Sequence, residues 1–167
     1  MRKVIGLLIF LSALIVTNLS ADEMFQAVDP KDATLVKTDS SKEFCNVCGM
    51  HLTKFYKTSH ATEFKNGHKE QYCSLHCQAQ IEEDHADKIK NIQVVDTNSL
   101  KFIDAKNAIY VVGSSKPGTM TPVSKYAFST KEEAVKFQKE FGGEIHTFDE
   151  SLDMAKKALI KENNAID

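Results

Sequence analysis

The stretch AIYVVGSSKPGTMTPVSKYAFSTKEEAVKFQKEFGGEIHTFDE, residues 108–150, decides the fold that we expect for this chain. The segment NAIYVVG (107–113), which overlaps its start, is rich in β-branched residues and predicts a strand. A second strand is predicted for VSKYAF (123–128). Between them, residues 113–122 are polar and contain glycine, serine and proline, which is typical of a long loop.

A helix and a third strand follow this pair. Thr130 and Glu133 form a capping box that starts the helix, and the Gly142-Gly143 pair stops it. EIHTF (144–148) then reads as a strand, and DESLDMAKKALIKE (149–162) has the apolar spacing of a terminal helix. The second half of the chain therefore has the order β, β, α, β.

The first half repeats this order. KTSHATEF (57–64) and HKEQYC (68–73) flank Asn66-Gly67, a dipeptide that favours a tight hairpin. SLHCQAQIEED (74–84) reads as a helix capped by its first serine, and IQVVD (92–96) as the closing strand. We therefore expect an α+β fold of two ββαβ units. One mixed sheet without a repeat is the alternative.

The N-terminus, residues 1–21, has the order of a secretory signal peptide. Arg2 and Lys3 precede an apolar run at 4–16, and small or polar residues lead to Ala21. The run is shorter than the ~20 residues that span a bilayer, although an uncleaved anchor is the alternative. No cysteine follows the run to accept a lipid. We expect a periplasmic protein whose mature form has no integral membrane span.

The rest of the chain divides into three parts. Residues 22–42 are polar and typical of a linker, residues 43–97 form a cysteine-rich lobe, and residues 98–167 form a second lobe with a C-terminal helix. The net charge of −2, with no basic cluster, argues against a nucleic-acid partner. The chain has neither a glycine-rich phosphate cradle nor a nucleophile elbow, so we expect a binding protein and not an enzyme.

The cysteine-rich lobe begins with FCNVCGMHLTKF (44–55). Cys-x-x-Cys-Gly predicts a tight turn with both sulfurs inward, and a second pair, four residues apart, lies at the predicted helix start. The Cys-x-x-Cys-Gly turn, called here the knuckle, is followed by a hairpin and then by the helix start. This order predicts a treble-clef metal site. Exported thiols stay reduced mainly when a metal or burial protects them. The four predicted thiol ligands are Cys45, Cys48, Cys73 and Cys77.

Two methionines bear on which metal the site takes. Met50 directly follows the cysteine turn. Met120 lies in a polar loop whose sequence has no apolar periodicity, so a role in core packing is not predicted for it. Thioethers suit Cu(I), whereas a closed site of four cysteines suits structural zinc. His51 is a further candidate ligand. A thioredoxin-like redox pair is a third alternative, which the glycine after the knuckle disfavours.

The block CNVCGM (45–50), together with the stretch 108–150, resembles the NosL family of nitrous oxide reductase accessory proteins over residues 43–150. The resemblance implies a periplasmic Cu(I) chaperone that supplies nitrous oxide reductase and works with an ATP-dependent maturation transporter. It also implies two ββαβ units, similar to an organomercurial lyase domain. The functional positions it carries over are Cys45, Cys48, Met50 and Met120.

This chain departs from the family pattern in two ways. It lacks the lipid-accepting cysteine common in the family, and YCSLHC (72–77) resembles the TRASH and YHS metal-binding modules. Copper alone at the cysteines, or zinc there with copper at the methionines, would both fit the sequence. Cu(I) delivery is the favoured function, followed by a zinc-stabilised interaction module and then a thiol-disulfide oxidoreductase.

Overall fold

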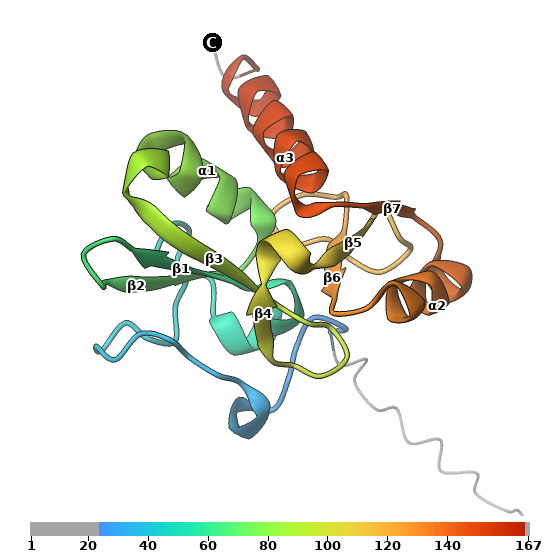
Figure 1. Ribbon diagram of the computed structural model, residues 1–167, viewed down its shortest axis with the longest axis horizontal. Helices are drawn as coiled ribbons and strands as arrows, with labels where there is room; N and C mark the ends of the chain where they lie inside the picture. Colours follow the sequence, from blue (N-terminus) through green and yellow to red (C-terminus); the bar gives the residue numbers. More distant parts are fainter. Residues whose placement is uncertain (1–23, 166–167) are drawn as a thin grey trace, which may run out of the picture.

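Two antiparallel sheets make up the fold, in a computed structural model that describes residues 24–165 (Figure 1). The predicted signal peptide, residues 1–21, lies outside the described residues. Within the described part, no helix is both long and apolar enough to cross a membrane.

The first sheet has four strands in the order β2-β1-β3-β4. Their bounds are β1 His60–Phe64, β2 Lys69–Tyr72, β3 Ile89–Val95 and β4 Phe102–Asp104. The helix α1, Leu75–His85, connects β2 to β3. In the register, His60 lies opposite Tyr72 on one side and Val94 on the other, so β1 is central.

The second sheet has three strands in the order β6-β5-β7. Its strands and helices are β5 Ile109–Val112, β6 Lys125–Phe128, α2 Lys131–Phe141, β7 Glu144–His146 and α3 Phe148–Asn163. In each unit the first strand is central, the second pairs on one side, and the third returns to the other side after a helix. The predicted α+β fold with two ββαβ units is therefore confirmed.

The structure corrects the sequence prediction in several places. Thr147 and Phe148 were expected to end a strand but cap and begin α3. Lys57 and Thr58 were expected at the start of a strand but end a 3-10 helix, Leu52–Thr58, and the strand begins at His60. The edge strand β4 was not predicted. Three further short 3-10 helices connect the elements: Pro30–Asp32, Ala86–Lys88 and Ala105–Asn107.

One apolar core joins the two units. The helix α1 packs against α3, and both lie on the same side of the molecule in Figure 1. Their buried residues Leu75 and Leu152 share a cluster with Val94 of the first sheet and Tyr110 of the second. Burial of these apolar side chains away from water stabilises the packing of the two units into one body.

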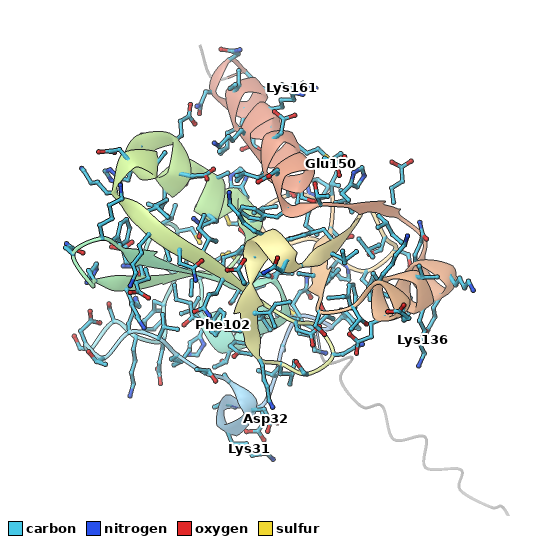
Figure 2. The ribbon with its side chains drawn as sticks, in the orientation of Figure 1. Lys31, Asp32, Phe102, Lys136, Glu150 and Lys161 are labelled. Atoms are coloured by element: carbon cyan, nitrogen blue, oxygen red, sulfur yellow. The ribbon has the colours of Figure 1, made fainter. Side chains whose placement is uncertain are left out.

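The helix α2 covers the other face of the second sheet. Because side chains alternate along a strand, Val111 faces α2 while Tyr110 faces α3. Phe137 of α2 packs on Phe128, with ring centroids 5.0 Å apart. Charged side chains such as Lys136 on α2 and Lys161 on α3 point outward (Figure 2).

The N-terminal segment 24–42, called here the arm, packs along the body. Val28 N donates to the Thr53 carbonyl at 3.0 Å, so the arm backbone pairs with the 3-10 helix Leu52–Thr58. The side chain of Gln26 is buried, and the Phe25 ring meets Tyr126 edge-on at 5.2 Å. The part of the arm around Lys31 and Asp32 projects from the molecule (Figure 2).

Candidate metal centre

The first cysteine pair lies in a tight knuckle. An antiparallel bridge between Phe44 and His51 closes it, and Gly49 has a φ of 72°, a left-handed conformation that glycine adopts without a Cβ clash. Gly49 N donates to the Cys45 carbonyl at 3.0 Å, and Cys45 N donates to the Met50 carbonyl at 2.9 Å. These bonds turn the knuckle sulfurs toward the interior.

The second pair lies where β2 gives way to α1. Cys73 directly follows the strand, and Cys77 lies in the first turn of the helix. The hydroxyl of the N-cap Ser74 accepts from Cys77 N at 3.3 Å, which fixes the start of the helix. Thr58 Oγ1 donates to the Cys73 carbonyl at 2.7 Å and holds this corner from the other side.

The four sulfurs converge on one point. All lie within 4.8 Å of one another and all are free thiols. The Cys48–Cys73 and Cys73–Cys77 sulfur distances are 3.4 and 3.8 Å. A tetrahedral ion with metal–sulfur bonds of ~2.3 Å places its sulfurs ~3.8 Å apart. The cluster therefore has the dimensions of a metal centre.

The cluster is enclosed except at Cys48. Cys45, Cys73 and Cys77 are buried, whereas Cys48 is partly exposed. Hydrogen bonds from the thiols of Cys73 and Cys77 hold the pKa of Cys45 well below its usual range. The same contact with Cys45, together with burial, raises the pKa of Cys73. Among these two thiols, Cys45 therefore loses its proton more readily than Cys73.

The two candidate thioether residues come from different units. Met50 is partly buried and packs against the cysteine cluster. Met120 is 41% exposed, has a φ of 66° and lies on the loop 113–124 between β5 and β6, called here the Met loop. This loop is joined to the cysteine site through Thr119 Oγ1, which lies 2.9 Å from Thr58 Oγ1.

Both ring nitrogens of His51 face partners other than the cysteines. This candidate ligand has Nδ1 2.9 Å from Thr53 Oγ1 and Nε2 3.8 Å from a Glu43 carboxylate oxygen. His76 is buried, with Nε2 3.6 Å from Glu162. His60 is fully buried.

The sequence did not indicate the long-range hydrogen bonds that hold the Met loop near the cysteine site. Thr58 and Thr119 are separated by 61 residues, and nothing in their local sequence links them. Gln26 is 91 residues from its partner Pro117. The cysteines, in contrast, could be recognised from their spacing in the sequence, because a tight turn and a helix start each fix the separation of neighbouring ligands.

Comparison with known proteins decides the family. The NosL family model matches residues 36–155. This chain belongs to the NosL family. The match includes both cysteine pairs and the Met loop, so the family identified from the sequence is confirmed.

Two relatives of this NosL protein are informative. A crystal structure of the copper chaperone NosL from Shewanella denitrificans superposes with a TM-score of 0.56 at 25% identity, covering 68% of this chain and 92% of that one. The HTH-type transcriptional repressor CutR of Bacillus subtilis (strain 168) is 25% identical over 118 residues, which are 71% of this chain. The chain spans 61% of the length of that repressor.

Proposed function

We propose that this NosL protein is an exported Cu(I) chaperone, which binds the ion and passes it on without chemical turnover. The observation that carries the proposal is the set of four free thiols within 4.8 Å, against which Met50 packs. Soft thiolates and thioethers are the donors that Cu(I) prefers. The similarity to a copper chaperone structure supports the same ion.

The partial exposure of Cys48 suits transfer. Buried ligands hold an ion tightly, whereas a receiving protein must reach the metal to exchange ligands with it. Cys48 is the one cysteine of the cluster that is not buried, and Met120 is exposed on a loop joined to the same site. We propose that copper enters and leaves on this side.

The receiving partner is proposed from the family. Nitrous oxide reductase, matured with an ATP-dependent transporter in the periplasm, is the destination that NosL membership supports. The predicted signal peptide agrees with that compartment. Pull-down of apo nitrous oxide reductase by copper-loaded protein, with transfer followed by copper analysis, would test this destination.

The test of Cu(I) binding uses a matched pair of exposed methionines. Met120→Ala should weaken Cu(I) binding about 10- to 100-fold in chelator competition and leave zinc affinity unchanged, since thioethers bind zinc poorly. Met154, 36% exposed on α3, is the control, and Met154→Ala should bind Cu(I) like the parent. Equal affinity of Met120→Ala, Met50→Ala and the parent would exclude a thioether role.

A zinc-stabilised module is the second candidate, because the sulfur spacing also fits a tetrahedral zinc site. Metal analysis of protein purified anaerobically from the periplasm separates the two. Zinc alone, with unfolding on chelation, would favour the module. A thiol-disulfide oxidoreductase has less support, since Cys45 and Cys48 lie in the knuckle and not at a helix start.

A further inference from the structure

We propose that Gln26, on the N-terminal arm, is a positioning residue that holds the Met loop at its working distance from the cysteine site. The inference rests on the proposed Cu(I) function and deepens it. It extends the metal site to a segment that the sequence marks only as a polar linker.

Gln26 bridges the two units. Its side chain is only 3% exposed, and Nε2 donates to the carbonyls of Pro117 and Gly118 at 3.1 and 3.2 Å. Its own carbonyl accepts from Lys57 N at 3.1 Å. Lys57 belongs to the 3-10 helix that follows the knuckle, so Gln26 ties the element after Met50 to the loop that carries Met120.

The neighbouring Phe25 anchors the arm. Its ring meets Tyr126 edge-on at 5.2 Å, and the ammonium groups of Lys57 and Lys116 lie 4.5 and 4.7 Å from its centroid. Lys116 itself belongs to the Met loop and also lies 4.1 Å from the Phe141 ring. Such cation–π contacts attach the loop to the arm a second time.

The Met loop has a conformation that its surroundings must impose. Met120 has a φ of 66°, which a non-glycine residue adopts only when neighbouring structure holds it. Tyr126 Oη donates to the Pro117 carbonyl at 2.7 Å, and Thr119 contacts Thr58. Gln26, together with Phe25, braces this loop from the arm.

This bracing has a consequence for copper binding. The two candidate thioethers belong to separate units, so their separation depends on the contacts between those units. A loop already held in place loses less freedom when the ion binds, which strengthens binding without adding a ligand. Removing the Gln26 donor should therefore weaken Cu(I) binding through Met120 alone.

The experiment compares two side-chain amides that each donate to loop carbonyls. Gln26→Leu keeps a buried side chain of similar bulk, removes the donor and adds no ligand for copper. Gln138→Leu is the matched control, because Gln138 Nε2 donates to the Gly143 carbonyl at 3.0 Å, on α2. We expect Gln26→Leu to weaken Cu(I) binding about 3- to 10-fold, by loss of preorganisation, and Gln138→Leu to bind like the parent.

A double-mutant cycle tests whether Gln26 acts through Met120. In a Met120→Ala background, Gln26→Leu should cause no further loss of Cu(I) affinity. An equal loss in both backgrounds, or no loss in the parent, would overturn the proposal. If Gln26→Leu does not fold, Phe25→Ala, which loosens the arm from a partly exposed position, replaces it in the same cycle.

A metal-free measurement separates this inference from the Cu(I) proposal. In apo protein labelled at the methionine methyls, the Met120 resonance should shift in Gln26→Leu and stay in place in Gln138→Leu. An unchanged Met120 resonance in Gln26→Leu would refute the positioning role whatever the metal. Unchanged Cu(I) affinity in Met120→Ala would instead count against the thioether ligand.

Discussion

Cys48 differs from the other three cysteines in both exposure and geometry. It is the partly exposed member of the cluster, and its sulfur lies 3.4 Å from that of Cys73. Cys45 is the nearest cysteine to Cys48 in the sequence, so a disulfide between these two would be the simplest expectation. The knuckle instead directs the Cys48 sulfur toward Cys73, which directly follows β2. The distance across the cluster therefore decides which thiols react.

We predict that mild oxidation of the metal-free protein with glutathione disulfide forms a Cys48–Cys73 disulfide. Peptide mapping by mass spectrometry without reduction would identify it. Cys45→Ser should leave this product in place, and Cys73→Ser should abolish it. A dominant Cys45–Cys48 peptide in the parent would show that the knuckle opens before it oxidises.

The candidate ligands could be predicted from sequence, but their supports could not. Cysteine spacing and Gly49 are local signals, since a knuckle and a helix start each fix neighbouring residues. The contacts that hold the Met loop are not local. Thr58 and Thr119 are in contact because the two units pack against each other. No local sequence pattern around either threonine predicts this contact.

At the scale of elements, the Met loop depends on a close approach at Gly118. A Cβ there would lie 2.1 Å from the Thr121 carbonyl oxygen, a clash with backbone. Gly67, in the β1–β2 hairpin, has open space around it but a φ of 85°. Alanine at these positions therefore perturbs the chain by different mechanisms, steric in one loop and conformational in the other.

We predict that Gly118→Ala weakens Cu(I) binding, because the loop must rearrange around Met120. Gly67→Ala should lower the free energy of unfolding by about 1 kcal/mol, the cost of a left-handed non-glycine residue, and leave Cu(I) affinity unchanged. Chelator competition and urea unfolding on both variants provide the measurements. Parent-like copper affinity in Gly118→Ala would mean that the loop does not contribute to the site.

The two ββαβ units could be predicted because each element has a local signal, such as the hairpin at Asn66-Gly67 or the capping box at Thr130. The misassigned and missed segments depend on tertiary contacts. The turn before β1 is fixed by Tyr56, whose hydroxyl donates to the Leu100 carbonyl at 3.1 Å. The strand β4 is an edge strand that pairs with β3, and its three residues are too few for an alternating pattern to show.

At the scale of the whole molecule, a polar contact crosses the core between the two sheets. His60, from the centre of the first sheet, has Nε2 3.0 Å from the hydroxyl of Tyr110, at the centre of the second. Its Nδ1 lies 3.0 Å from the Thr58 carbonyl, which requires a proton on that nitrogen. In the neutral imidazole Nε2 therefore accepts from the Tyr110 hydroxyl, and this contact joins the two units.

Burial in this core lowers the pKa of His60 from its usual 6.5 to about 3. Between these two pH values the unfolded chain binds a proton at this residue and the folded chain does not. The stability that neutral His60 contributes is therefore fully present above pH 6.5 and is lost progressively as the pH falls toward 3. Tyr110, whose pKa burial raises well above its usual value, stays neutral throughout this window.

We predict that metal-free protein loses about 2 kcal/mol of unfolding free energy at this residue between pH 7 and pH 5. Urea unfolding at both pH values would measure the total loss, to which other groups also contribute. His60→Gln, which keeps a polar side chain but cannot titrate, should lose about 2 kcal/mol less than the parent over the same interval. His68→Gln, which removes an exposed imidazole and keeps His60, should follow the parent. If His60→Gln loses as much stability as the parent, the buried imidazole is not the source of the acid sensitivity, and the contact between the sheets tolerates a charged ring.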